Sequence, residues 1–201
     1  MKKKGSGLRT TIAILLMAIV IVGAFAYLSN RTDKVRAEAP AIMTPVQEVL
    51  SRNLKTDYPA TPKELLKYYS EITRCFYSED YSDEELENLA DRSRELFDDE
   101  LAQNQTREQY LASLKLDIDS YHNNSKSISS YSVSSSTDVD YYNYEGYEWA
   151  QLYCIYSVRI STAIEPVQEH FLLRKDEDGH WKIFGWKIED PNKEELAQKD
   201  T

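Results

Sequence analysis

The sequence has few of the residues from which metal sites and nucleophilic active sites are built. Only 2 cysteines and 3 histidines occur in 201 residues. The cysteines form no CxxC pair, and no Cys/His spacing typical of zinc binding is present. There is no GxSxG motif, and residues 176–180 carry too few ligands, at the wrong spacing, for an EF-hand. The sequence therefore predicts no metal and no cofactor, and it assigns no catalytic residue.

Charge is absent from residues 10–30, between Arg9 and Arg31. Within this stretch, residues 12–28 are almost entirely apolar. About 20 helical residues, each rising about 1.5 Å, cross a hydrocarbon core of about 30 Å. The stretch is therefore long enough for a transmembrane helix, and we expect residues 1–30 to form a short cytoplasmic tip and a membrane anchor.

The flanks of the anchor predict its orientation. Four basic side chains and no acidic one precede it, whereas the basic residues that follow it are diluted by Asp33 and Glu38. Under the positive-inside rule, the N-terminus is cytoplasmic and the following domain lies outside the cell. A cleaved signal peptide is the competing interpretation, because Ala24-Phe25-Ala26 resembles a cleavage site. Both interpretations export the domain.

The chain beyond the anchor is acidic. The first thirty residues carry four of the 24 basic residues and none of the 34 acidic ones, so the rest has a net charge of −14. Such a surface repels phosphate backbones, so nucleic acid is not an expected partner. We expect a linker over residues 31–43, a folded domain over 44–190 and a flexible tail over 191–201. The expected partners are the membrane, through the anchor, and a protein or glycan of the cell envelope.

The two cysteines, Cys75 and Cys154, both lie in the exported part. An oxidising compartment permits a disulfide between them. Cysteine also packs as a small buried hydrophobe, and both residues fall on apolar faces. A disulfide and two separate buried thiols both fit the sequence.

Four helix starts share one pattern, a Ser or Thr followed three residues later by Glu or Gln. In this capping box, the hydroxyl and the Glu or Gln side chain satisfy amides at the helix start. The four boxes begin at Thr44, Thr61, Ser82 and Thr106. Apolar residues recur behind each start at i, i+3, i+4 and i+7, which predicts four amphipathic helices with one buried face each.

Beyond Asn124 the apolar period changes from 3.6 to 2. We predict strands over residues 127–142, 149–162, 167–174 and 180–188, with turns at Glu145-Gly146 and over residues 176–179. Short turns between consecutive strands predict an antiparallel meander. The sequence thus predicts an α+β fold in which helices cover one face of a curved four-stranded antiparallel sheet.

This order of helices and long strands, ending in the segment DEDGHWKIFGW, resembles the nuclear-transport-factor-like (cone or cystatin-like) superfamily over residues 61–188. The segment TPVQEVLSRNLKTDYPATPKELLKYYSEITRC is similar to an uncharacterised family of short membrane-anchored proteins of Gram-positive gut bacteria. The first resemblance implies a cone-like domain. It does not imply one activity, because the superfamily includes small-molecule isomerases, dehydratases and non-catalytic modules.

Enzymes of that superfamily place an Asp, His or Tyr inside the cone to move a proton. The resemblance suggests four candidates of these types: Tyr69, Tyr77, Asp138 and His170. None of them matches a family motif at a specific position. His170 lies on the same strand face as Gln168, and a structural or surface role is the favoured interpretation.

Aromatic residues crowd around the predicted turn at Glu145-Gly146. They are Tyr141, Tyr142, Tyr144, Tyr147 and Trp149. Tyr and Trp combine a large contact area with a polar tip and are enriched in recognition surfaces. They are also common in strands and cores, which is the simpler interpretation. If the patch is exposed, it is the expected binding site for a protein or glycan.

Two functions follow from these observations. The first is a membrane-anchored extracytoplasmic binding or assembly module without catalytic activity, similar in architecture to assembly factors of secretion or conjugation channels. The alternative is an exported small-molecule enzyme of the isomerase or dehydratase type, which requires an open cone holding a desolvated acid or base.

Overall fold

The structure, a computed structural model, describes residues 43–189. The predicted anchor over 1–30, nearly all of the linker over 31–43 and the tail over 191–201 lie outside the described residues. Among the helices that are described, none has the length and apolarity needed to cross a membrane.

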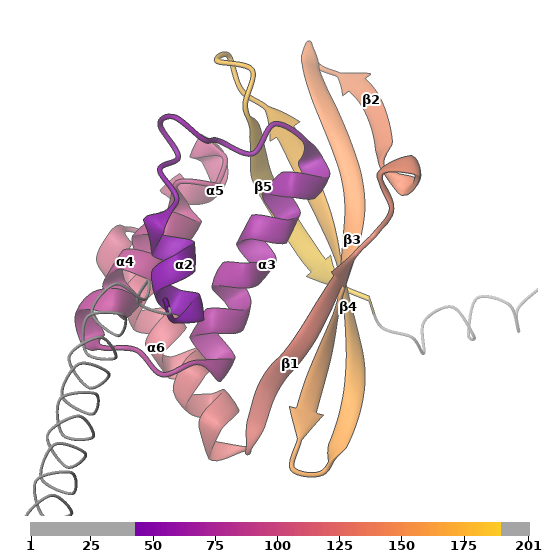
Figure 1. The fold of residues 1–201 in the computed structure, drawn as a ribbon. Helices are drawn as coiled ribbons and strands as arrows, with labels where there is room; N and C mark the ends of the chain where they lie inside the picture. Colours follow the sequence, from indigo (N-terminus) through magenta and orange to yellow (C-terminus); the bar gives the residue numbers. More distant parts are fainter. Residues whose placement is uncertain (1–42, 190–201) are drawn as a thin grey trace, which may run out of the picture. The chain divides into compact units, whose positions relative to one another are not determined.

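The described chain folds into two layers (Figure 1). The helices α2 to α6 form one layer and all the strands form the other, so one face of the twisted sheet is covered and the other is open. The helices are α2 (Pro45–Ser51), α3 (Pro62–Ser78), α4 (Asp83–Arg94), α5 (Asp99–Gln103) and α6 (Arg107–Asn123). The strands are β1 (Lys126–Val133), β2 (Asp140–Tyr144), β3 (Tyr147–Ile160), β4 (Ala163–Lys175) and β5 (Trp181–Ile188). The predicted α+β fold with an antiparallel sheet is confirmed.

All four predicted helix starts are confirmed, and three of them form complete capping boxes. The boxes at Thr44, Ser82 and Thr106 have both hydrogen bonds in place. At Thr61 the hydroxyl accepts from the amide of Glu64, but the Glu64 carboxylate binds the amide of Ala60 instead of returning to the cap. The helix still starts where predicted, because one cap and Pro at the first position suffice.

The prediction of four strands was wrong, because the segment over residues 127–142 forms two. Both β1 and β2 pair with the same edge of β3, β1 along residues 154–160 and β2 along residues 147–151. The chain leaves the sheet at Ser134, and the hydroxyl of Ser135 then accepts from the amide of Thr137 in a short 3-10 helix, η1 (Ser136–Asp138). Serine side chains compete for backbone groups in this way and interrupt a strand.

A further short helix, α5, was not predicted. It begins at Asp98, whose carboxylate accepts from the amide of Glu100. The backbone of the same residue donates to the carbonyl of Ile183 at 2.8 Å, which ties the helix start to β5. The sequence of α5 has no apolar stripe from which the helix could be predicted, because none of its residues is buried.

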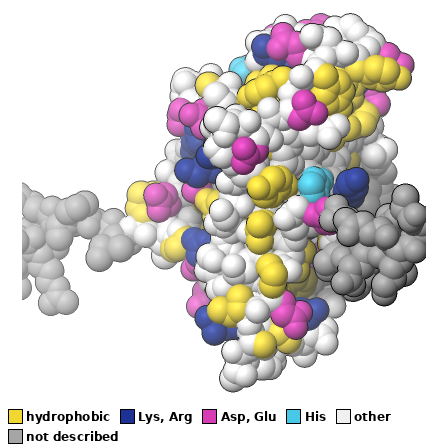
Figure 2. Space-filling view, turned by 90° about the vertical axis from the view of Figure 1, so that its right-hand side faces the viewer, with side chains coloured by type: hydrophobic (Ala, Val, Ile, Leu, Met, Phe, Trp, Pro, Cys, Tyr) yellow, Lys and Arg dark blue, Asp and Glu magenta, His cyan; other side chains and the backbone are white. Residues whose placement is uncertain are grey.

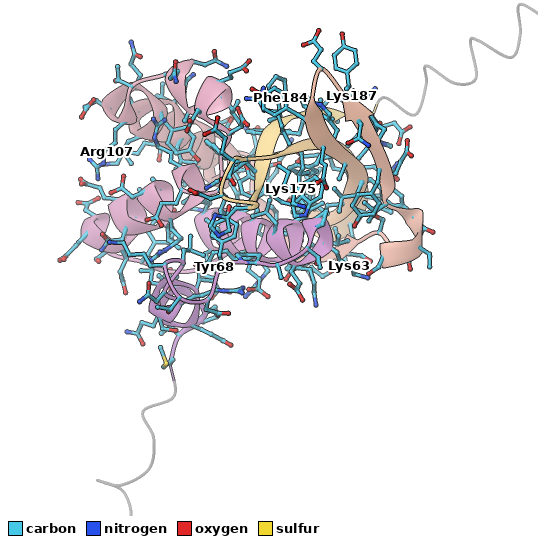
Figure 3. All side chains as sticks on the ribbon, turned by 90° about the horizontal axis from the view of Figure 1, so that it is seen from above. Lys63, Tyr68, Arg107, Lys175, Phe184 and Lys187 are labelled. Atoms are coloured by element: carbon cyan, nitrogen blue, oxygen red, sulfur yellow. The ribbon has the colours of Figure 1, made fainter. Side chains whose placement is uncertain are left out.

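The core lies between the two layers. Seen from above, side chains from α3 and from the sheet fill this space (Figure 3). The fully buried members include Leu65 and Ile72 of α3, Phe171 and Leu173 of β4, and Ile183 of β5. The period of 2 expected for the second strand is seen in β3, where Ala150, Leu152, Cys154, Tyr156 and Val158 are buried on one face, and Trp149 is buried in addition.

Candidate functional site

A cavity of about 480 Å³ opens between α3, the end of α4, α5, α6 and the last strand. We call it the aromatic pocket, because six rings line it: Tyr69, Phe76, Tyr77, Phe97, Tyr110 and Trp186. The polar lining comes from Thr73, Arg94, Asn104, Gln105, Ser113 and Asp117, and Leu101 and Leu114 complete the wall. Its size falls in the range of about 300–1,000 Å³ that is usual for small-molecule sites.

The rings of the pocket hold one another in place. Tyr69 packs edge-on against Phe171, with ring centroids 5.7 Å apart, and lies 6.0 Å from Trp186. Phe97 meets Tyr110 edge-on at 5.7 Å. Offset and edge-on contacts of this kind are the favoured geometries of aromatic pairs. The wall is therefore preformed on the buried faces of α3 and α6.

A carboxylate lies at the mouth of the pocket. Asp117 is exposed on α6, and its Oδ2 accepts a hydrogen bond of 3.0 Å from the hydroxyl of Tyr77. Burial raises the pKa of Tyr77, and the charge of Asp117 raises it further. The ring of Tyr77 also packs on Tyr121 at 4.3 Å. The phenol thus stays protonated and remains a donor to Asp117.

A guanidinium group, that of Arg94 at the end of α4, lies near the start of α6. The Nη2 of Arg94 donates to the carbonyl of Ala102 at 3.0 Å, and its Cζ lies 5.5 Å from the centroid of the Tyr110 ring. The hydroxyl of Tyr110 is hydrogen-bonded to Ser93 at 2.8 Å. Within residues 43–189, neither Arg94 nor Asp117 forms an ion pair.

Glu169 is a functional candidate that sequence reasoning missed. It pairs with Cys154 and Ile188 and alternates with Phe171, so it faces the helices. Burial raises the pKa of this carboxyl to about 7. Burial raises the pKa of Tyr121, and the charge of Glu169 raises it further. The signal was present in the sequence, because period 2 places this acid on the same face as Phe171 and Leu173.

Both cysteines are buried free thiols in the structure. The Sγ of Cys154 lies 3.4 Å from the hydroxyl of Ser70, which in turn lies 3.1 Å from the hydroxyl of Tyr156. Burial raises the pKa of Cys75 to about 11 and also raises that of Cys154. Of the two possibilities left open by the sequence, the structure has the separate thiols.

The four candidates that the resemblance suggested do not lie together. Tyr69 and Tyr77 line the aromatic pocket, whereas Asp138 is exposed in η1. His170 lies on the open face of the sheet, where its Nε2 is 3.0 Å from the carboxylate of Glu189. Its partner is therefore a surface carboxylate on the far side of the sheet from the pocket.

The aromatic residues of the β2–β3 hairpin divide into exposed and buried members. Figure 2 shows the open face of the sheet, where hydrophobic side chains gather most densely at its upper end. Tyr141, Tyr144 and Tyr147 are exposed, Tyr142 is half-buried, and Trp149 is buried. The indole of Trp149 donates to the carbonyl of Tyr144 at 3.0 Å, so this ring shapes the hairpin. Binding of a partner at the three exposed tyrosines stays a prediction.

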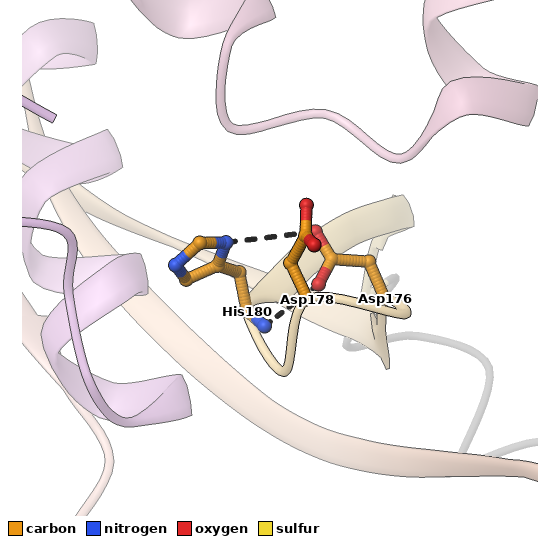
Figure 4. A group of neighbouring side chains, drawn as sticks. All are labelled: Asp176, Asp178 and His180. Carbon is orange, nitrogen blue, oxygen red and sulfur yellow. Dashed lines mark hydrogen bonds and ion pairs between the residues drawn. The ribbon is translucent and has the colours of Figure 1, made fainter. Parts of the chain in front are cut away.

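The loop between β4 and β5 brings Asp176, Asp178 and His180 together (Figure 4). Their ligand atoms lie within 4.8 Å of one another. The carboxylate of Asp176 already accepts from the amide of His180 at 2.7 Å, and Gly179 adopts a positive φ of 81°. The ring of His180 packs on Tyr58 at 4.4 Å. These contacts explain the loop as the predicted hairpin turn.

No curated protein matches this chain. A family model described as a domain of unknown function (DUF6715) matches residues 1–186, which is most of the sequence. The chain therefore belongs to the DUF6715 family.

Proposed function

We propose that this domain is a non-catalytic binding module that holds a small ligand in the aromatic pocket. The observation that carries the proposal is the lining itself, six aromatic rings around about 480 Å³ with a few polar side chains among them. Apolar walls with a few polar groups are typical of ligand sites. Aromatic and aliphatic side chains make up most of the lining, which favours recognition of a ligand with an apolar part.

The same proposal puts the module outside the cell on an N-terminal membrane anchor. The support is the uncharged stretch over residues 10–30 and the basic side chains before it. The order of helices and then strands, with a pocket between the two layers, supports a place in the nuclear-transport-factor-like superfamily. A role in assembling an envelope complex, similar to that of secretion or conjugation channel factors, fits this arrangement.

Site-resolved photolabelling tests the binding proposal. A small apolar diazirine is crosslinked to the purified full-length protein, and the labelled peptides are mapped by mass spectrometry. We expect label on the pocket face of α6, around Tyr110 and Leu114. Ser113→Trp blocks the pocket mouth and should abolish this label. Ser120→Trp, at another exposed position of α6 that lies outside the pocket, should retain it. Equal labelling of α6 in both variants would refute the proposal.

The enzyme alternative rests on one specific observation, the helix-facing carboxyl of Glu169. With its pKa raised to about 7 by burial, this group can both accept and donate a proton near neutral pH. A panel of small carbonyl compounds incubated with the protein in D₂O would reveal exchange of α-protons by NMR. An enzyme of the isomerase type should exchange at least one compound, and Glu169→Gln should lose that exchange. Absence of exchange across the panel would eliminate this alternative.

A further inference from the structure

We infer that the ligand of the aromatic pocket is a zwitterion with an apolar middle, a peptide of about three residues with both termini free. This inference rests on the proposed function, because it names the ligand class of the same pocket. Its basis is the position of two opposite charges at the two ends of one apolar groove.

The first charge is the carboxylate of Asp117. One of its oxygens accepts from Tyr77, and no basic side chain in residues 43–189 pairs with it. The other oxygen is available to a cation, and the Tyr77 oxygen beside it is an additional acceptor. An ammonium group, with three donors and no acceptor, is complementary to this end of the groove.

The second charge is the guanidinium of Arg94. It lies over the ring of Tyr110, and its Nη2 donates one hydrogen bond to the carbonyl of Ala102. In the described part of the chain, no carboxylate pairs with it. Arginine presents a planar fork that matches a carboxylate, so the C-terminal carboxylate of a ligand fits this end.

The spacing of residues along helix α6 gives an estimate of the distance between the two charged ends of the groove. Tyr110 and Asp117 both line the pocket and are seven residues apart, which is about 10 Å along a helix rising about 1.5 Å per residue. Because the guanidinium of Arg94 lies over the ring of Tyr110, the two positions of α6 that carry the charged ends of the groove, Tyr110 and Asp117, are about two helical turns apart. An extended chain covers at most about 3.3–3.6 Å per residue, so the termini of about three residues span this distance. A single amino acid is too short to reach both ends.

The apolar walls between the two charged ends determine which kind of central side chain the ligand can have. Phe76, Phe97, Leu114 and Trp186 present ring or aliphatic carbon to the groove. An apolar side chain of the ligand that enters the groove leaves water, which favours binding. An apolar central side chain is therefore favoured over a charged one.

Competition against the photolabel of the pocket tests this inference. Four forms of alanyl-leucyl-alanine are compared on the full-length protein: free, N-acetylated, C-amidated and capped at both ends. We expect the free peptide to protect the pocket best, with each cap weakening protection at least tenfold. Free dipeptides and pentapeptides should also protect at least tenfold less well than the free tripeptide.

Two charge variants assign the ends. Asp117→Asn should no longer distinguish the free from the N-acetylated peptide, yet should still reject the amide. Arg94→Gln should no longer distinguish the free from the C-amidated peptide, yet should still bind the N-acetylated peptide more weakly. Arg94→Lys should recover part of the discrimination against the amide, because it keeps the charge. Asp119→Asn, exposed on the same helix and outside the pocket, should match the unchanged protein.

Three outcomes separate this inference from the proposed function. If all four peptides protect equally, the pocket binds apolar ligands but the inference about charge is wrong. If the probe labels the pocket and no peptide competes, the inference about peptides is wrong and the binding proposal stands. If the probe never labels the pocket, the proposed function itself fails.

Discussion

Arg174 of β4 binds Asp98 at the start of α5 through two hydrogen bonds, Nε to Oδ2 at 2.9 Å and Nη2 to Oδ1 at 2.6 Å. The two side chains are only 13% and 5% exposed. The rings of Tyr147, Trp149 and Phe184 pack around the guanidinium, with centroids 4.7, 5.5 and 5.0 Å away. Part of the aromatic hairpin therefore serves to shield an ion pair that joins the sheet to the helical layer.

Asp98→Ala should lower the free energy of unfolding by up to about 3–5 kcal/mol, because it removes two hydrogen bonds from the buried guanidinium of Arg174 and leaves it only the exposed carboxylate of Glu100, 2.7 Å from Nη1. It also removes the cap of α5. Urea denaturation measures the loss. The matched control is Asp91→Ala, which breaks the pair with Arg107, where both side chains are 42% exposed. Water solvates an exposed charge, so the control should lose clearly less. Equal losses would contradict a structural role for the buried pair.

Thr106→Ala should lower the free energy of unfolding by about 1 kcal/mol, because the amide of Gln109 loses its acceptor at the start of α6. Thr106→Gly should lower the free energy of unfolding by only about a few tenths of a kcal/mol, since glycine is tolerated at a helix N-cap. Denaturant titrations of the two variants side by side provide the measurement. The prediction fails if glycine is the worse substitution.

The free energy of unfolding should fall as the pH rises from about 4 to about 7, because Glu169 ionises in the folded state only toward the upper end of this range. Its folded pKa of about 7 lies above the unfolded value of 4.5. The folded state therefore holds the proton more tightly, and this contribution is complete below the unfolded pKa and lost as the pH rises through the folded one. The shift corresponds to roughly 3 kcal/mol at about 1.36 kcal/mol for each pH unit.

Glu169→Gln tests this pH dependence. The neutral amide should flatten the decline between pH 4 and 7 and raise stability at pH 8, by up to about 3 kcal/mol relative to the unchanged protein. Urea unfolding at pH 5 and pH 8 measures both effects. Glu165→Gln changes an exposed acid of the same strand and should leave the profile unaltered. A profile that is the same in both variants would show that Glu169 ionises without cost in the fold.

Cys75 and Cys154 should resist alkylation in the native protein. Both are fully buried, and burial raises the pKa of each thiol, so little thiolate is present to react. Mass spectrometry after iodoacetamide treatment should show no modification without denaturant and two modifications in urea. Absence of modification in urea without a reductant, followed by two modifications after reduction, would instead indicate a disulfide.

Sequence alone determined the features that depend on near neighbours. The hydroxyls of Thr44, Thr61, Ser82 and Thr106 locate four helix starts, because a cap binds amides only two or three residues away. The alternation along residues 150–158 identifies the buried face of β3 for a similar reason, since successive side chains of any strand point to opposite faces.

Tertiary structure decided the features that join distant parts of the chain. The aromatic pocket draws Tyr69, Arg94, Asp117 and Trp186 from three helices and a strand, and no local pattern specifies that meeting. The division of the first predicted strand depends on β3, since both β1 and β2 pair with its edge. The pKa of Glu169 depends on the helices that exclude water from it. Packing sets these properties, because desolvation and charge act through space and not along the sequence.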